Sequence, residues 1–153
     1  AEEYNKLLTI EIVLSSSFFI NSKTYTLRFY ESNFLHLTGI STSLTAKDFF
    51  KKCLNKTIST EDLNDIKSAN EKCTIKNKLF ALQQLSQCFN QTINVQEDFI
   101  KNLISCTIAT SDGVRTIGFI KAGLVNRPMT LLNKNKLNNS KPIIRIKPLV
   151  KKK

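Results

Sequence analysis

One histidine, His36, is the residue of this chain whose type best suits proton transfer. An imidazole in water titrates near neutral pH, so a histidine can act there as a general acid or a general base. The sequence neighbours Leu35 and Leu37 are apolar, and a histidine between leucines also fits a packed, hydrogen-bonded core position. Two interpretations therefore stay open for His36, a proton-transfer residue and a core residue.

Two further residues are of types that suit contact with a phosphate group. Arg127 precedes Pro128, which biases its backbone to an extended conformation and gives its side chain a defined origin. A guanidinium can hold two phosphate oxygens in a fork. Thr130 lies three residues further on, and its hydroxyl could orient the same phosphate or an attacking group. An ordinary surface arginine and an ordinary strand threonine remain the simpler interpretations.

The positive charge of the chain is concentrated in its last quarter. The 153 residues include 23 Lys and Arg against 12 Asp and Glu, a formal net charge of +11, and Asp112 is the last acidic residue. A local potential of this kind attracts polyanions, with nucleic acid as the first candidate and an anionic membrane surface as the second. A solubilising basic tail is the plainest alternative. The candidate phosphate contacts are Arg115, Lys121, Lys134, Lys136, Arg145 and Lys147.

Other functional classes find little support in the sequence. The four cysteines form no C-x-x-C pair, so we expect free thiols in a reducing, cytoplasmic compartment and no structural zinc. The pairs Asp62/Asp65 and Glu97/Asp98 are typical of solvated helix starts rather than of a magnesium site. No apolar stretch approaches the roughly 20 residues of a membrane-spanning helix, and no phosphate-binding loop occurs. We therefore expect no metal, no cofactor and no membrane association.

Helical signals occupy the middle of the chain. Gly39 is a suitable left-handed end for a short helix. Thr45 is a suitable N-cap for the next helix, and Ser59 with Asp62 resembles a capping box for a third. Apolar residues at helical spacing then predict the most regular helix. The predicted helices cover residues 31–40, 46–54, 60–69 and 75–89.

Strand signals stand on both sides of this helical middle. The Asp112-Gly113 turn is the strongest short-range hairpin signal, and Pro148 marks the last strand as an edge strand. The order is an N-terminal β-hairpin, a helical middle and an antiparallel sheet in the C-terminal half. This order predicts one α+β domain over residues 1–150 with a basic tail at 151–153. The predicted strands cover residues 8–14, 23–30, 103–110, 114–121 and 142–150.

Several segments carry a family resemblance when they are taken in order. They are the strand end at 29–33, the F-x-H-L-x-G segment at 34–39, the helix at 46–50, the hairpin at 103–121 and the Arg-Pro-Met-Thr segment at 127–130. Together they resemble the phage–barnase–EndoU–colicin–RelE-like nuclease domains, small toxins of phages and mobile elements. The resemblance spans about residues 8 to 132. It implies a barnase/RelE-like fold and a metal-independent ribonuclease with a basic and polar site on an antiparallel sheet.

The chemistry that this resemblance implies matches the candidate residues. Metal-free RNA cleavage uses the neighbouring 2′-hydroxyl as nucleophile, and needs a base, an acid and positive charge at the transition state. His36 then becomes a proton-transfer residue, Arg127 a phosphate clamp and Thr130 an orienting hydroxyl. Because the chain has a single histidine, a lysine, a tyrosine, water or charge alone must serve in place of a second one. With His36 buried, the protein would bind RNA without cleaving it.

We therefore predict a ribonuclease toxin or phage effector that cleaves RNA, with tRNA as one candidate substrate. A toxin implies an antitoxin or immunity protein, and an acidic one would suit the basic face. Two alternatives come from other classes, a non-catalytic basic nucleic-acid-binding module and an inhibitor protein of a phage or mobile element. Salt-sensitive binding separates nucleic-acid binding from pure protein interaction, and cleavage without metal separates the enzyme from the module.

Overall fold

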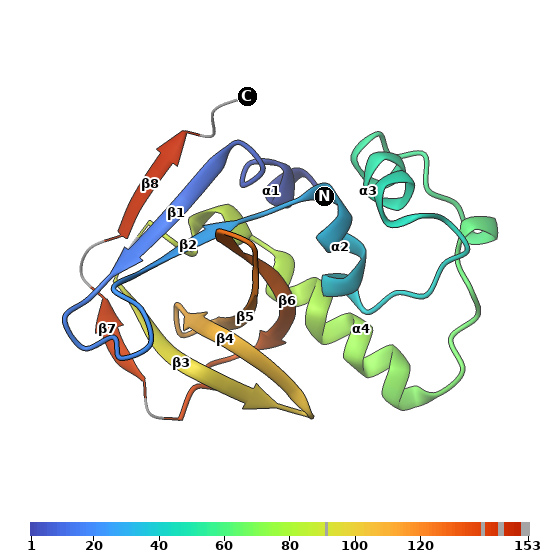
Figure 1. Cartoon of the computed structure of the whole chain (residues 1–153). Coiled ribbons are helices and arrows are strands. Elements are labelled where there is room, and N and C mark those ends of the chain that lie inside the picture. Colours follow the sequence, from blue (N-terminus) through green and yellow to red (C-terminus); the bar gives the residue numbers. More distant parts are fainter. Residues whose placement is uncertain (91, 139, 144–145, 151–153) are drawn as a thin grey trace.

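The computed structural model describes residues 1–90, 92–138, 140–143 and 146–150, with side chains described as far as Ile143. The main helices are gathered on one side of a curled sheet (Figure 1). They are α1 (Glu2–Asn5), α2 (Glu31–Thr38), α3 (Ala46–Leu54) and α4 (Ala69–Leu82), with short 3-10 helices η1 (Thr60–Asp62) and η2 (Leu85–Gln87). The strands are β1 (Ile10–Ser15), β2 (Thr24–Arg28), β3 (Ile93–Lys101), β4 (Ile104–Ser111), β5 (Arg115–Ala122), β6 (Val125–Asn133), β7 (Lys141–Ile143) and β8 (Ile146–Val150).

The strands form one sheet in the order β7-β3-β4-β5-β6-β2-β1-β8. Neighbouring strands are antiparallel except β2 and β6, which are parallel. β7 and β8 stand at opposite ends of this order, although two residues separate them along the chain. Because three Cα–Cα steps span at most about 11 Å, the two edges of the sheet must lie close together. The sheet is therefore rolled up, as Figure 1 shows.

These elements confirm the predicted α+β class. The N-terminal hairpin and the Asp-Gly hairpin both form, and Asp112 Oδ1 accepts hydrogen bonds of 3.0 Å from the backbone N–H groups of Val114 and Arg115. The single strand predicted over residues 142–150 is wrong, because this segment supplies both β7 and β8. Pro148 does lie in an edge strand, since β8 ends the sheet. For β3, the sequence predicts only a short β-rich segment at residues 92–95, because the polar residues 96–98 interrupt the alternation of this strand.

Two of the predicted helices also need correction. Gly39, with φ 70°, is the C-cap of α2, and Thr45, whose Oγ1 accepts from the Asp48 N–H, is the N-cap of α3, both as expected. The helix predicted over residues 60–69 is only the single turn η1, because Leu63 is extended and forms a β-bridge with Thr42. The helix predicted over 75–89 begins earlier, at Ala69, and ends at Leu82.

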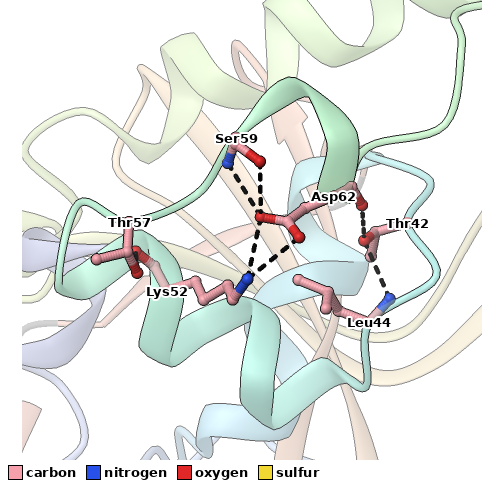
Figure 2. Close-up of polar contacts among 6 residues, drawn as sticks. All are labelled: Thr42, Leu44, Lys52, Thr57, Ser59 and Asp62. Atoms are coloured by element: carbon pink, nitrogen blue, oxygen red, sulfur yellow. Dashed lines mark hydrogen bonds and ion pairs between the residues drawn. The ribbon is translucent and has the colours of Figure 1, made fainter.

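The capping box at Ser59 serves the loop between α3 and α4 instead of a long helix (Figure 2). The carboxylate of Asp62 accepts the backbone N–H of Ser59 at 3.0 Å and lies 3.2 Å from Lys52 Nζ of α3. These two contacts hold the pKa of the Asp62 carboxyl below its usual value. Thr42 donates its hydroxyl to the Asp62 carbonyl and accepts the Leu44 N–H at 3.1 Å. The loop is thereby fixed to both α3 and the segment after α2.

An aromatic cluster joins the helices to the sheet. Tyr4 of α1 is fully buried, and its ring centroid lies 5.6 Å from that of Phe29, 5.2 Å from Phe34 and 5.8 Å from Phe50. Phe29 continues the cluster to Phe119 of β5 at 5.8 Å. Edge-to-face ring pairs of this kind add to the burial of apolar area. The cluster therefore fixes the position of α2 over the sheet.

Gly118 of β5 allows three strands to approach closely. A Cβ atom at this position would lie 2.6 Å from Cys106 Sγ in β4 and 2.8 Å from Thr130 Cγ2 in β6. Both neighbouring side chains are buried. The register of β5 and β6 also shifts between Gly118 and Phe119, so that β6 carries an irregularity beside Met129.

We expect Gly118→Ala to lower the free energy of unfolding by about 1–3 kcal/mol, because the added methyl overlaps atoms that cannot move freely. Urea denaturation measures this loss. The double variant Gly118→Ala/Cys106→Ala removes the nearest overlapping atom, so part of the stability should return. A single variant as stable as wild type would contradict this account of the close approach.

Candidate active site

Helix α2 lies alongside strand β6, and two contacts fix this arrangement. At its start, the Arg127 guanidinium carbon of β6 lies 4.0 Å from the ring centroid of Tyr30, the N-cap residue of α2. At its end, Lys78 of α4 connects the two elements. Its Cδ atom lies 3.0 Å from the position that a Cβ at Gly39 would take, and its Nζ donates to the Leu131 carbonyl of β6 at 2.9 Å. The three predicted catalytic residues thus lie on two adjacent elements (Figure 1).

His36 lies on the solvent face of α2. Its side chain is exposed, whereas Phe34 and Leu37 of the same helix are buried. The apolar neighbours that suggested a core histidine, Leu35 and Leu37, pack against the core while His36 points away from it, because residues adjacent in sequence lie about 100° apart around a helix. An exposed imidazole on this helix is accessible to a large ligand.

Arg127 has a second arginine beside it, and we call Arg28 and Arg127 the arginine pair. β2 and β6 are paired in parallel with Leu27 opposite Asn126, and both of these side chains are buried. The next residues on the two strands, Arg28 and Arg127, therefore lie beside each other on the opposite face of the sheet. The Arg28 guanidinium carbon lies 5.1 Å from the same Tyr30 ring. Both Nε atoms are buried without a hydrogen-bond partner among the described residues.

The charges of the arginine pair are only partly balanced. Glu11 Oε1 lies 3.4 Å from Arg28 Nη1, and within the described residues no carboxylate forms an ion pair with Arg127. Two guanidinium groups on one ring with a single carboxylate leave a local positive potential, which suits an anion such as phosphate. Sequence reasoning missed Arg28, because its proximity to Arg127 depends on the parallel β2–β6 pairing.

A second basic feature, the lysine groove, lies between α4, the β3–β4 turn and the end of β6. Its volume is about 510 Å³, and the residues that define it are Lys78, Lys101, Asn102, Thr130, Lys134 and Lys136. Of the described residues that line this groove, none is acidic. Four ammonium groups without a carboxylate create a path that suits a phosphate backbone.

Lys78 differs from the other lysines of the groove. It is half-buried, and burial lowers the pKa of its ammonium group. Its hydrogen bond to the Leu131 carbonyl keeps the Lys78 Nζ on the side of the groove that β6 forms. The sequence gives no reason to select Lys78 and Lys101, because both lie before Asp112, where acidic and basic residues are balanced. Their alignment with the later lysines results from folding alone.

Comparison with known families gives a match over the full length of the chain. The sequence model of the family described as phage-Barnase-EndoU-ColicinE5/D-RelE like nuclease 4 matches residues 1–153. The chain belongs to this family. No curated protein and no solved structure matches the chain. The match confirms the resemblance inferred from the sequence, and it makes the protein a nuclease of the barnase/EndoU/colicin/RelE type that acts on nucleic acid.

In this nuclease, Arg115 does not lie on the basic surface. It is 6% exposed, its Nε lies 3.3 Å from Asp112 Oδ2, and its Nη1 donates to the Gln83 carbonyl at 2.8 Å. The guanidinium therefore joins β5 to the end of α4 and is not available to a nucleic acid. This placement does not fit the expectation that Arg115 contacts RNA, because the guanidinium is buried and already bound to Asp112 and to the Gln83 carbonyl within the fold.

The other predicted contacts of this nuclease fall into separate places. Lys134 and Lys136 line the lysine groove, and Thr130 lines it with only 4% of its surface exposed. Lys121 is exposed but lines another pocket, of about 570 Å³, together with Asp98. Arg145 and the side chain of Lys147 lie outside the described residues.

Glu97 and Asp98 do not begin a helix, as the sequence had suggested, but lie in β3. The Glu97 carboxylate accepts the backbone N–H groups of Ile20 at 2.8 Å and Asn21 at 2.9 Å, and also the Tyr25 hydroxyl. It therefore fixes the β1–β2 loop to the sheet. Among the described residues, no three His, Cys, Asp or Glu side chains lie close enough to hold a metal ion. In the same part of the chain, no helix is long and apolar enough to cross a membrane.

Proposed function

We propose that this nuclease cleaves RNA by attack of a 2′-hydroxyl on the adjacent phosphate, without a metal ion. The observation that carries the proposal is the lysine groove, whose described lining holds no carboxylate and which lies against β6, the strand that carries Arg127 of the arginine pair. A 2′-hydroxyl acts as an internal nucleophile held close to phosphorus, so positioning and charge can supply most of the catalysis. DNA lacks this hydroxyl, so the mechanism restricts the substrate to RNA.

Each site residue has a role in this reaction. His36 accepts the proton of the 2′-hydroxyl as O2′ bonds to phosphorus. The arginine pair binds the non-bridging oxygens, which gain negative charge in the transition state, and the Thr130 hydroxyl orients the phosphate from the groove. The P–O5′ bond then breaks, and Lys78 or water returns a proton to O5′. The products are a 2′,3′-cyclic phosphate and a 5′-hydroxyl end.

The remaining lysines position the RNA rather than react with it. Lys101, Lys134 and Lys136 face the groove, and Lys121 is exposed nearer the β5–β6 turn. Contacts of ammonium groups with phosphates carry no sequence information. A basic surface of this kind also favours an acidic protein as inhibitor. We therefore propose that the nuclease acts in the cytoplasm as a toxin or phage effector whose antitoxin or immunity protein covers the groove.

The decisive experiment measures cleavage of fluorescently labelled RNA and tRNA in EDTA. Wild type should produce fragments with 2′,3′-cyclic phosphate ends and leave DNA of the same sequence intact. The variant Lys134→Ala/Lys136→Ala should bind RNA about tenfold more weakly, with a salt slope reduced by about 1 to 2. Lys47→Ala/Lys51→Ala removes two exposed charges from α3 and serves as the matched control.

The outcomes separate the alternatives. Cleavage that stops in EDTA and returns with Mg²⁺ contradicts the metal-free mechanism, and equal cleavage of DNA contradicts the role of the 2′-hydroxyl. Salt-sensitive RNA binding without any cleavage favours a non-catalytic nucleic-acid-binding module. An equal effect of the two double variants would show that net charge, rather than the groove, determines affinity.

A further inference from the structure

The β3–β4 hairpin extends beyond the sheet as an arm, which we define as residues 98–107. β4 pairs with β5 only from Ile108 onward, whereas Phe99↔Cys106, Ile100↔Ser105 and Lys101↔Ile104 pair within the hairpin. Figure 1 shows the tip of this hairpin projecting from the body of the molecule. A second, smaller apolar cluster packs the base of the arm against the rest of the chain, with Phe99 and Cys106 buried against Leu132 and Leu137.

The tip of the arm carries an exposed apolar side chain on an unfavourable backbone. Asn102 and Leu103 have φ values of 52° and 68°, the left-handed region in which such two-residue turns usually carry Asn-Gly. Leu103 is fully exposed at 101%, and Ile100 beside it is 64% exposed. A leucine in this conformation is strained and gains no burial within the chain. Strained backbone conformations cluster at functional sites, so the tip of the arm is a candidate for contact with a ligand.

The surroundings of the tip indicate the chemistry of its ligand. Lys101 and Asn102 line the lysine groove together with Lys134 and Lys136. Leu103 therefore stands at the rim of a groove whose described lining is basic and carries no carboxylate. A polyanion with apolar groups near each charge fits this combination, and single-stranded RNA has a flat base next to every phosphate.

We propose that Leu103 is an apolar wedge that packs against, and partly unstacks, the bases of RNA whose phosphates lie in the lysine groove. In proteins that bend duplex DNA, apolar side chains such as leucine enter base steps and open the stack, and the same contact is available to the stacked bases of RNA. This inference rests on the proposed RNA substrate, and it assigns the bases of that RNA as the groups that the arm contacts. A base moved out of its stack leaves its sugar and phosphate freer to reach the in-line geometry that 2′-hydroxyl attack requires.

The test variant is Leu103→Gly, which removes the wedge and suits the backbone of the turn. Because glycine adopts positive φ readily, the melting temperature should stay unchanged or rise. The ligand is a single-stranded oligonucleotide with 2′-O-methyl sugars, which cannot be cleaved, and with 2-aminopurine at successive positions. We expect affinity to fall about tenfold to a hundredfold, the range for burial of one leucine. The rise in 2-aminopurine fluorescence that wild type produces should disappear.

Leu124→Gly is the matched control. Leu124 is 99% exposed at the β5–β6 turn and does not line the lysine groove. Its variant should bind like wild type. Unchanged affinity and fluorescence in Leu103→Gly would overturn the wedge, as would an equal loss in both leucine variants. If Lys134→Ala/Lys136→Ala weakens binding while Leu103→Gly does not, the proposed RNA function stands and the wedge is wrong. If wild type binds no RNA at all, the proposed function fails and the wedge with it.

Discussion

Replacing His36 by alanine is expected to lower kcat/KM for RNA cleavage by about two to four orders of magnitude, the range for loss of a general acid–base group. The free energy of unfolding should hardly change, because the side chain is exposed and alanine is the best helix former. Cleavage of fluorescently labelled RNA in EDTA measures the first effect, and urea denaturation measures the second.

Chemical rescue makes this test specific for proton transfer. Imidazole added to the buffer should restore part of the activity of His36→Ala, because it can occupy the vacant space beside α2 and accept the proton. His36→Gln keeps a polar side chain but cannot transfer protons near neutral pH, so it should be as inactive as the alanine variant. Fragments produced at the wild-type rate by His36→Ala would remove His36 from the mechanism while leaving the nuclease family unaffected.

Replacing Arg127 by alanine is expected to lower kcat by about two to three orders of magnitude, the range for loss of one transition-state donor. Its guanidinium is held 4.0 Å from the Tyr30 ring beside Arg28, so it needs little reorganisation to bind a phosphate. RNA affinity should fall much less than kcat, because the lysines of the groove still bind the backbone. Single-turnover cleavage together with binding of 2′-O-methyl RNA separates the two effects.

Variants at neighbouring positions show whether the arginine pair acts as a unit. Arg127→Lys keeps the charge but loses the planar fork, so it should recover only a small part of the rate. Arg28→Ala should lower kcat as well, and its effect should not add to that of Arg127→Ala if both guanidiniums bind one phosphate. Full activity in Arg127→Lys would contradict a bidentate contact. If Arg127→Ala lowered the free energy of unfolding by as much as it raised the activation free energy of cleavage, the role of Arg127 would be in folding and not in catalysis.

Local sequence signals located much of the fold where short-range chemistry decides the structure. Gly39 ends α2 and Thr45 begins α3 as expected, because both signals satisfy backbone groups within a few residues. The capping box at Ser59 also forms as expected, yet it is followed only by the 3-residue helix η1. Leu63 pairs instead with Thr42, a residue 21 positions earlier, and no local pattern could reveal that contact.

The candidate site divides in a similar way. Sequence reasoning selected His36 and Arg127 from their residue types and from the family resemblance, and the fold brings their elements side by side. It also selected Arg115 from net charge, although that guanidinium is buried against Asp112 and Gln83. A charge count does not distinguish a buried arginine from an exposed one, because both contribute equally to the sum.

The sequence by itself determined the α+β class, the two hairpins and the family, since these depend on periodicity, turn residues and ordered motifs. Only the tertiary structure decided which cations face one another. The parallel pairing of β2 with β6 joins Arg28 to Arg127, and the packing of α4 against β6 brings Lys78 to Lys134 and Lys136. These residues are between 56 and 99 positions apart, and contacts over such separations result from burial of the common core rather than from any local signal.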